Sequence, residues 1–547
     1  MKYLLSIFLV ALLLFGCVAN PQKQAQPLPE KENLAQANQN AQKPFYQGCA
    51  MWMGCRGMMQ GIIGQQEGLE DFQPASFTQR QLAQAVEIAD GGKFSLEANI
   101  IKTTLFGRDQ YLYGYNSQIP GPMLRVKQGS KIYVDFKNSI DQPTTVHWHG
   151  IRLQNKFDGV PNVTQPEVQP GGSFTYELDF PDEGIYWYHP HVREEVQQER
   201  GLYGVIMAEP AEEGYYNKAD KEEVVVLDDV LLDRNGNLYP FGKNFTNFAI
   251  MGRFGNQPLI NGKESYTTTV KAGQVLRLFF LNTANVRPFN ISIAGVKMKM
   301  VGSDSGKFEH SFFADSFIIS PSERYIVEVA FEKPGKYTIL NVNPFSSYRL
   351  GEIIVDGSPS EFLTDFLQLG NNTEISEGIE PYKKYFGLPP DFEYRLNVDI
   401  PGAMMGMGMM MEHDEDGIEW EDTMFGMNLL STNENLEWRI IDSQTGKWNM
   451  NATREVSAGK PIKIRLNNTK VSVHPMQHPI HLHGARFLVL EKDGVKNDNL
   501  AWKDTVLVPV GSTVDILTYF PNKGEWMMHC HIAEHLGSGM MTSFKAV

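Results

Sequence analysis

Short runs that alternate apolar and polar residues recur along the chain, separated by Gly, Pro and Asn. Clear examples are the runs at 131–136 and 173–178. A period of two is typical of half-buried antiparallel strands, and many such strands with regular turns predict sandwiches or barrels. Three copies of one β-domain would account for the length of 547 residues. The sequence therefore predicts an all-β protein with domains at 76–210, 211–357 and 358–547.

The N-terminal residues predict export. Residues 1–16 contain one lysine and then an almost unbroken apolar run, which is too short for an ordinary membrane-spanning helix and typical of a secretory signal peptide. The sequence LFGC at 14–17 is similar to the lipobox of bacterial lipoproteins, in which the cysteine is acylated. Ordinary cleavage near Ala19 is the alternative. Both interpretations predict an exported, periplasmic protein, and the first adds a lipid anchor through Cys17.

Residues 17–75 are predicted to form a flexible tether, because the stretch up to residue 45 is rich in Gln, Asn, Ala and Pro and has little to bury. Farther along this tether, Cys49 and Cys55 are interleaved with methionines. Thiol and thioether groups so close together would suit a soft cation such as Cu(I). A small disulfide loop that packs on the first domain is an equally open interpretation.

Histidines carry the strongest functional signal. Ten of the 13 lie in four short motifs, and each motif contains one His-x-His pair. Chance at this histidine frequency would give roughly 0.3 such pairs in the chain. Residues two apart in a strand face the same side, so each pair offers two imidazoles to one site. The motifs contain His147 and His149; His189 and His191; His478, His481 and His483; and His529, His531 and His535. Four pairs are enough for one metal ion with two ligands and two ions with three each.

Cys530 identifies the metal. It lies between the two histidines of the fourth His-x-His pair, so in a strand it faces the side opposite to both. His478, His535 and Met540 are then its available partners. Two histidines, one cysteine and a weak axial methionine are the ligand set of a blue-copper electron-transfer site. An electron accepted at Cys530 would have a short covalent path through the backbone to the neighbouring histidines.

The four motifs, in this order, resemble those of three-domain multicopper oxidases, the family of laccases, ascorbate oxidases and bacterial cuprous oxidases. Residues 115–124, 258–263 and 502–506 are similar to further signatures of its three domains. The resemblance covers about residues 95–547. It implies three cupredoxin-like Greek-key β-sandwich domains and an enzyme that binds four copper ions and reduces dioxygen to water.

The resemblance also implies a role for each ligand. The type 1 copper would be held by His478, Cys530, His535 and Met540. The type 2 copper would be held by His147 and His481. The type 3 pair would lie between the first and third domains, on His149, His189, His191, His483, His529 and His531. The second domain carries no His-x-His pair and would bind none of the four ions.

Two acids are catalytic candidates beside Cys530. Asp158 matches an acid that helps to supply protons during oxygen reduction in the family, although an aspartate before Gly159 is also typical of a simple turn. Glu534 aligns with another family acid, which either transfers protons or orients the site. Many bacterial members carry a second acid directly after the type 1 histidine, and Leu536 replaces it here.

Methionines indicate the electron donor. Met476 matches the thioether that bacterial cuprous oxidases place two residues before the type 1 histidine, and His474 stands where they carry an aspartate. The insertion 403–427 resembles the methionine-rich insertion of the same enzymes. Its six clustered thioethers, interleaved with glycine, make a poor packed core but suit Cu(I). They belong to Met404, Met405, Met407, Met409, Met410 and Met411.

These features predict a monomeric oxidase that takes electrons from Cu(I), with Fe(II) as a further candidate, and so serves copper tolerance. A net charge of −15 agrees with a cationic donor and argues against nucleic acid as a partner. One alternative is a laccase-like oxidase of phenols or aromatic amines, in which the methionine loop only controls access. The other is a copper-storage or copper-carrier protein whose oxidase core is inactive.

Overall fold

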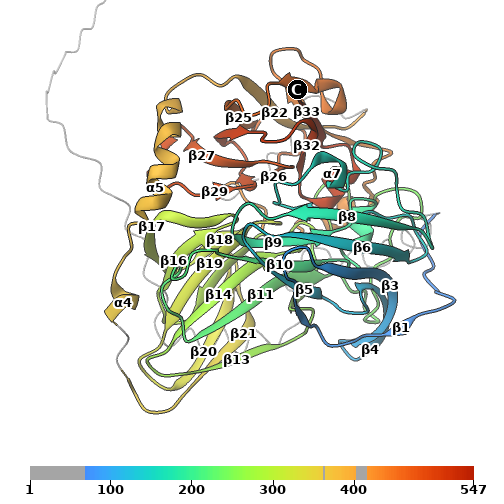
Figure 1. The fold of residues 1–547 in the computed structure, drawn as a ribbon. Coiled ribbons are helices and arrows are strands. Elements are labelled where there is room, and N and C mark those ends of the chain that lie inside the picture. Colours follow the sequence, from blue (N-terminus) through green and yellow to red (C-terminus); the bar gives the residue numbers. More distant parts are fainter. Residues whose placement is uncertain (1–67, 361–363, 402–415) are drawn as a thin grey trace, which may run out of the picture. The chain divides into compact units, whose positions relative to one another are not determined.

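Six β-sheets, arranged in three pairs, form the architecture of the part of the chain that the structure describes. The computed structural model describes residues 68–360, 364–401 and 416–547. In each pair, apolar side chains from both sheets meet in one buried cluster, as alternation along the strands requires. We call the pairs sandwich 1, sandwich 2 and sandwich 3, in chain order (Figure 1). The prediction of an all-β protein built of three sandwiches is confirmed, and the exact domain boundaries remain predictions.

Sandwich 1 pairs a sheet that contains the predicted strand at 131–136 with a sheet that carries the first two histidine motifs. The first sheet runs β1 (Thr78–Gln79), β3 (Lys93–Leu105), β6 (Lys131–Ser139) and β8 (Ser173–Asp179), with β4 (Arg108–Tyr115) paired to β3. The second runs β2 (Ala85–Glu87), β5 (Gly121–Lys127), β10 (Gly204–Glu209), β9 (Gly184–His189) and β7 (His147–His149). Both sheets are mixed and not purely antiparallel, since β3 pairs parallel with β6 and β5 with β10.

Sandwich 2 repeats this arrangement without a histidine motif. Its first sheet runs β12 (Gln257–Ile260), β11 (Lys221–Val230), β14 (Val275–Asn282), β19 (Arg324–Ala330), β16 (Met298–Ser303) and β17 (Gly306–Ala314). Its second runs β13 (Tyr266–Lys271), β21 (Ser347–Asp356), β20 (Gly335–Val342), β15 (Phe289–Ile293) and β18 (Phe317–Ile319). The strand β14 departs from the predicted half-buried pattern, because all eight of its residues are buried. Phe279 and Leu281 of this strand pack with Ile185 and Trp187 of sandwich 1, so the outer face of the sheet is an interface.

Sandwich 3 carries the third and fourth histidine motifs on neighbouring strands. Its first sheet runs β23 (Glu437–Asp442), β22 (Phe392–Asp399), β25 (Ile462–Asn468), β31 (Thr513–Tyr519), β27 (Arg486–Lys492) and β28 (Val495–Lys496), with β29 (Trp502–Lys503) paired to β27. Its second runs β24 (Arg454–Val456), β33 (Met541–Ala546), β32 (Gly524–Cys530), β26 (His478–Leu482) and β30 (Thr505–Val508). Both predicted functional centres therefore share one sheet of this sandwich.

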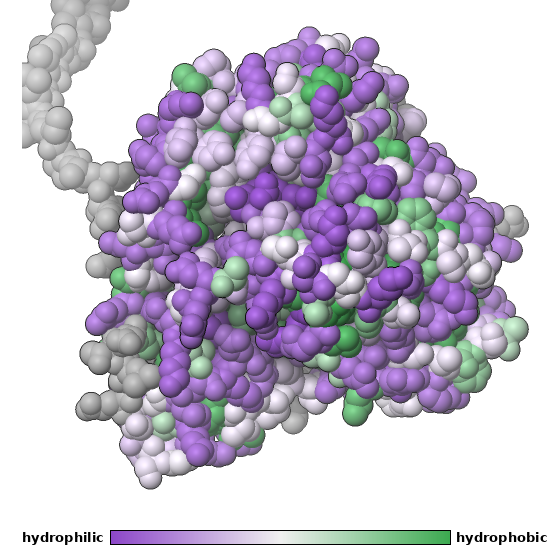
Figure 2. Space-filling view, viewed as in Figure 1, coloured by the Kyte–Doolittle hydropathy of each residue, from purple (hydrophilic) through white to green (hydrophobic). Residues whose placement is uncertain are grey.

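Short helices occupy the connections between strands. They are η2 (Asn155–Phe157), α3 (Glu194–Gln197), α4 (Thr364–Leu367), α5 (Thr373–Ile379), η3 (Glu380–Tyr385), α6 (Phe425–Leu430), η4 (Asn449–Ala452) and α7 (Ala533–Gly537). Among the residues with described structure, no helix has the length and apolar character to cross a membrane. Hydrophilic residues cover most of the face shown in Figure 2, with hydrophobic ones scattered between them.

The predicted tether is wrong for its last residues. Glu70 Oε2 lies 2.9 Å from Arg200 Nη2, and the ring of Phe72 packs edge-on against Tyr113. This segment is held to sandwich 1, because Glu70 and Phe72 both find buried partners there. The predicted signal peptide, Cys17, the Cys49–Cys55 segment and the methionines at 404–411 lie outside the described residues.

Candidate metal centre

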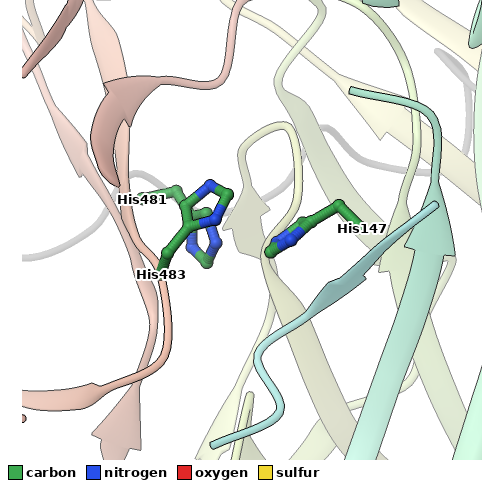
Figure 3. Close-up of side chains that lie close together, drawn as sticks. All are labelled: His147, His481 and His483. Carbon is green, nitrogen blue, oxygen red and sulfur yellow. The ribbon is translucent and has the colours of Figure 1, made fainter. Parts of the chain in front are cut away.

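Four strands bring eight histidines together where sandwich 1 meets sandwich 3. In sandwich 1, β7 pairs with β9 so that His147 lies opposite His189. In sandwich 3, β26 pairs with β32 so that His481 lies opposite His529. Each sandwich thus contributes a cross-strand histidine pair, and the other members of the His-x-His motifs extend it. Figure 3 shows His147 from sandwich 1 facing His481 and His483 from sandwich 3.

The rings of these eight residues, the histidine cluster, are closely packed and at most 8% exposed. Pairs of rings that meet across the contact are His149 with His481 (3.6 Å between centroids), His147 with His483 (3.9 Å), His189 with His531 (5.1 Å) and His191 with His529 (5.3 Å). The predicted convergence of the four His-x-His pairs is therefore what the structure contains. Neither sandwich alone holds the complete set.

For three histidines of the cluster, hydrogen bonds determine which ring nitrogen is left to bind a metal ion. His147 Nδ1 lies 2.7 Å from the carbonyl oxygen of Asp158, and His481 Nδ1 lies 2.8 Å from that of Asp504. A carbonyl oxygen only accepts, so each Nδ1 donates its proton and each Nε2 keeps its lone pair. His149 is held the other way round, because its Nε2 lies 3.0 Å from the Asp504 carboxylate.

The donor set fits bound metal ions. Within the histidine cluster, the buried ring nitrogens without a hydrogen-bond partner are Nδ1 of His149, Nε2 of His147, His189, His191 and His481, and both ring nitrogens of His531. Unpartnered buried polar atoms are costly, and a convergent set of them is explained by ligands to a metal. Burial, together with neighbouring rings, lowers the pKa of His149, His481 and His483 well below its usual range. These imidazoles are therefore neutral at neutral pH, as metal ligands must be.

Asp158 connects the two sandwiches at this cluster. It follows the turn η2, and Gly159 comes next with φ of +82°. A Cβ on Gly159 would lie 2.0 Å from the Val146 carbonyl oxygen, so only glycine lets this turn rest against the start of β7. The carboxylate Oδ2 of Asp158 lies 2.9 Å from His483 Nδ1, and Oδ1 has no hydrogen-bond partner. The predicted acid is thus in contact with the cluster.

Two buried glutamates lie close to ligand-type histidines, Glu194 in contact with His189 and Glu534 directly before His535 in the sequence. Oε1 of Glu194, the first residue of α3, lies 2.6 Å from His189 Nδ1 and 3.9 Å from His531 Nε2. Glu534 Oε1 accepts a hydrogen bond of 3.0 Å from Asn285 Nδ2, and its Oε2 has no hydrogen-bond partner. Burial raises the pKa of both carboxyls to about 7. Carboxyls with such values can exchange protons at neutral pH.

A second group of ligand-type residues lies on the opposite face of β32. Cys530 Sγ lies 3.5 Å from His478 Nδ1 and 3.7 Å from His535 Nδ1, and the two Nδ1 atoms are 3.3 Å apart. Met540 is completely buried in the same apolar cluster as Cys530, and its carbonyl accepts a hydrogen bond from the Cys530 N–H. The predicted set of two imidazoles, one thiol and one thioether is therefore assembled in sandwich 3. Strand alternation separates it from His529 on the cluster side.

The surroundings of this thiol are apolar and aromatic. Burial raises the pKa of the Cys530 thiol and lowers that of His478 to about 3. Trp438 of β23 stacks on His535 with centroids 4.0 Å apart and donates from its indole N–H to the Ala249 carbonyl. A dry shell of this kind controls solvent access and redox potential at a copper site.

The two residues predicted to meet the donor are buried. Met476 is 0% exposed and packs in the apolar cluster around Cys530, and His474 is 3% exposed. The segment that follows the methionine-rich residues lies beside them: Glu419 N–H donates to Gln477 Oε1 at 2.9 Å, and Gln477 Nε2 donates to the Glu419 carbonyl at 3.0 Å. Residues 416–420 are thus held by two hydrogen bonds to Gln477, the residue that precedes His478. The substrate-binding role of Met476 and His474 remains a prediction.

Comparison with known proteins identifies the family. Family profiles described as multicopper oxidase match residues 99–213, 215–352 and 425–547, which is more than half of the chain. The chain belongs to the multicopper oxidase family. This multicopper oxidase is accordingly a copper-dependent oxidoreductase that passes electrons from a reducing substrate to dioxygen.

Individual relatives of this multicopper oxidase span most of its length. It is 29% identical to multicopper oxidase MmcO of Mycobacterium tuberculosis over 463 residues, which is 78% of this chain and 82% of the relative. It is 24% identical to copper resistance protein A of Escherichia coli over 567 residues, with 82% and 92% covered. A solved multicopper oxidase from Pseudomonas thermotolerans matches with a TM-score of 0.62 at 25% identity, covering 85% of this chain and all of the other. A Campylobacter jejuni enzyme described as a metallo-oxidase shares the fold, with a TM-score of 0.66 at 22% identity and 88% and 98% covered.

Three residues at the centre of this multicopper oxidase were not among the residues predicted from the sequence. Asp504 stands within the 502–506 strand signature, but nothing in the signature assigns its carboxylate to His149. Glu194 follows the second histidine motif by three residues, and an acid so close to a ligand pair was an available signal. Arg324 pairs with Asp504 from 180 residues away, and no local pattern could have indicated that contact.

Proposed function

We propose that this multicopper oxidase binds four copper ions and couples the oxidation of Cu(I) to the four-electron reduction of dioxygen to water. The observation that carries the proposal is the pair of centres on the two faces of β32. Cys530 and its two imidazoles lie on one face, and His529 of the eight-histidine cluster lies on the other. One short stretch of main chain therefore joins a site suited to accept single electrons to a site suited to several metal ions.

The contacts support a division of the ligands among the ions. His191, His483 and His529 offer nitrogens within 4.8 Å of one another, which suits one type 3 ion. The other type 3 ion would be held by His149, His189 and His531. The type 2 ion would be held by His147 and His481, whose Nδ1 atoms are both fixed by aspartate carbonyls. The type 1 ion would be held by His478, Cys530, His535 and Met540.

Copper at these residues would supply one-electron chemistry, and the chain's own residues orient the rings, exclude water and handle protons. Asp158 holds His147 and His483, and its unpartnered Oδ1 can carry a proton to the cluster. Glu194 offers a second carboxyl at His189, on a chain in which Leu536 replaces an acid that many bacterial members carry. Glu534 is held by Asn285 and acts as a buried carboxyl near the type 1 group.

The described end of the insertion supports Cu(I) as the donor. Residues 416–420 are held by Gln477, the residue before His478, and by a 2.9 Å hydrogen bond from Val510 N–H to the Gly417 carbonyl. The described chain therefore resumes, at residue 416, next to the type 1 group. Thioethers select Cu(I), so a soft-metal site in the insertion would deliver its ion close to the point of electron transfer. The relative named copper resistance protein A agrees with a role in copper tolerance.

The test compares oxygen uptake with Cu(I) and with a phenol. The variant replaces the six methionines at 404–411 by leucine, which keeps the apolar bulk and removes the thioethers. Deletion of the whole insertion 403–427 is less informative, because it would also remove Ile418 and Trp420, which are buried. We expect the apparent affinity for Cu(I) in the oxygen-uptake assay to fall by about tenfold or more, which is equivalent to about 1.4 kcal/mol of lost binding. Phenol oxidation should be kept or should rise.

Other outcomes favour other functions. An equal loss with both donors would mean that the insertion acts only on access, and unchanged Cu(I) turnover would contradict the donor proposal. Efficient phenol oxidation with slow Cu(I) turnover in the parent would favour a laccase-like enzyme, as in the relative from Arthroderma benhamiae named laccase. A fully copper-loaded protein that consumes no oxygen would favour copper storage. Fe(II) is tested as a third donor in the same assay.

We also propose that the protein is exported through residues 1–16 and works in the periplasm. The apolar run and the following Cys17 support this proposal, and a lipid anchor through Cys17 is part of it. Fractionation of cells and mass analysis of the mature N-terminus test it. A full-length cytoplasmic protein would contradict export, and an unmodified N-terminus at residue 20 would contradict the anchor.

A further inference from the structure

Arg324 is fully buried where the three sandwiches meet, although the described residues of its own sandwich supply no histidine to the cluster. It is the first residue of β19. Its Nη1 donates to Asp504 Oδ1 at 2.6 Å, and its Nη2 donates to Asp504 Oδ2 at 2.5 Å. Its Nε donates to the Ile185 carbonyl of sandwich 1 at 2.8 Å, and Nη1 also donates to the Ser322 carbonyl of sandwich 2 at 3.1 Å. One side chain therefore contacts all three sandwiches.

Asp504 transmits this contact to two rings of the cluster. Its Oδ1 lies 3.0 Å from His149 Nε2, and its carbonyl oxygen lies 2.8 Å from His481 Nδ1. These two rings stack with centroids 3.6 Å apart. A bidentate guanidinium fixes the plane of a carboxylate, whereas a single hydrogen bond leaves it free to turn. The orientation of His149 is thus set by the carboxylate that Arg324 holds, together with Thr505 Oγ1, which lies 3.2 Å from the same ring nitrogen.

The residue after His149 leaves space for this ion pair. Gly150 has φ of +88°, and a Cβ there would lie 2.5 Å from Asp504 Oδ2 and 2.8 Å from Arg324 Nη2. The first histidine motif is therefore packed directly against the pair. A side chain at this position would push the carboxylate and His149 apart.

We propose that Arg324 is a positioning residue of the histidine cluster, which fixes Asp504 and through it the orientation of His149 and His481. The inference rests on the proposed function, because it takes these rings as copper ligands. It gives sandwich 2 a part in the centre: this sandwich sets the geometry of one type 2 ligand and one type 3 ligand. Arg324 takes no direct part in the reaction, because its side chain donates to Ile185, Ser322 and Asp504 and to no ligand nitrogen.

The experiment compares three variants at this pair with one control. Arg324→Met removes the guanidinium, and Arg324→Lys keeps the charge without the bidentate fork. Arg324→Met with Asp504→Asn removes both charges, so that no unpaired anion is buried if the single variant fails to fold. The control is Arg277→Met, which breaks another buried pair of sandwich 2, in which Arg277 Nη2 lies 2.6 Å from Glu328 Oε1. Both members of the control pair are at most 3% exposed.

Readouts are copper content after dialysis, the EPR spectrum of type 2 copper, the near-ultraviolet band of the type 3 pair and the blue band of type 1 copper. We expect Arg324→Met to lower the affinity of the cluster for copper by about 10- to 100-fold and to change the type 2 spectrum, with the blue band unchanged. Arg324→Lys should lie between this variant and the parent. Arg277→Met should lower thermal stability and leave all three copper signals unchanged.

A folded Arg324 variant with the parent's type 2 spectrum and copper affinity would overturn the inference. Equal spectral changes in Arg277→Met would also overturn it, because they would indicate a general loss of stability. A parent protein that shows no type 2 or type 3 copper would instead refute the proposed function. The two failures are therefore distinguishable.

Discussion

Asp158 and Asp504 hold the histidine cluster in a crossed arrangement. Each accepts a hydrogen bond at its main-chain carbonyl from a histidine of its own sandwich, His147 for Asp158 and His481 for Asp504. Each also contacts, through its carboxylate, a histidine of the other sandwich, at 2.9 Å for His483 and 3.0 Å for His149. The two aspartates differ in one respect. Both carboxylate oxygens of Asp504 accept hydrogen bonds from Arg324, whereas Asp158 Oδ1 has no hydrogen-bond partner. Both aspartates therefore orient rings of the cluster, and Asp158 Oδ1 is the carboxylate oxygen to which we assign the proposed proton transfer.

This difference predicts the effect of Asp158→Asn. The amide oxygen can still accept from His483, so copper content should be retained, while proton delivery at this position is lost. We expect oxygen turnover to fall by about 100-fold, within the usual contribution of a general acid. Turnover and copper content are measured on the same sample. Loss of copper in proportion to the loss of turnover would mean that Asp158 only holds the site together.

The close packing at Gly150 predicts a large effect of Gly150→Ala. The substitution combines strain at φ of +88° with a collision against Asp504, which together should cost about 2 to 5 kcal/mol in the free energy of unfolding. Gly129→Ala is the matched control, because Gly129 has φ of +84° and nothing within 4 Å of its Cβ position. The control should cost about 1 to 2 kcal/mol and leave copper binding intact. Equal costs in denaturant titrations of the two variants would contradict the packing argument.

The main features of the fold and of the site follow from local patterns. Alternation of period two predicts the sandwiches, and the same rule places Cys530 on the face of β32 opposite to His529. The burial of β14 on both faces was not predictable, because it depends on the packing of sandwich 2 against sandwich 1. The anchoring of Glu70 by Arg200 was not predictable either, because the two residues lie 130 positions apart in the sequence.

The second set of residues around the ligands was only partly predictable. The spacing of the histidines predicted the ligands, because residues two apart in a strand point to the same face. The Asp504 carboxylate of sandwich 3 contacts His149 of sandwich 1, and the Arg324 guanidinium of sandwich 2 contacts Asp504, so no interval in the sequence encodes these contacts. Burial of Met476 in the apolar cluster around Cys530 was likewise not visible in its spacing from His478.

Cys530→Ser tests the division into two centres. Serine removes the thiolate that gives blue copper its intense absorption, while His529 on the other face of β32 stays in place. We expect the blue colour to disappear, oxygen turnover to fall to background, and the copper of the histidine cluster to be retained. The checks are the visible spectrum and copper content. Retained blue absorption would show that Cys530 is not the type 1 ligand.

The pKa of Glu534 predicts a pH-dependent effect of Glu534→Gln on the copper-free protein. Burial raises the folded-state pKa of this carboxyl to about 7, above its value of 4.5 in an unfolded chain. Between these values the folded parent binds more protons than the unfolded parent, so this group makes the parent less stable as pH rises. Glutamine does not titrate, so the stability of the variant relative to the parent should rise by about 3 kcal/mol from pH 4 to pH 8. Urea titrations across this range measure it, and a constant difference would refute the assignment.

The most direct test of the central claim is the ratio of Cu(I) oxidised to oxygen consumed by the copper-loaded protein, with hydrogen peroxide measured in the same reaction. Two joined centres that collect single electrons and complete the reduction to water predict four Cu(I) per oxygen molecule and no free peroxide. A ratio of two with accumulating peroxide, or copper loading that leaves oxygen unconsumed, would contradict the account.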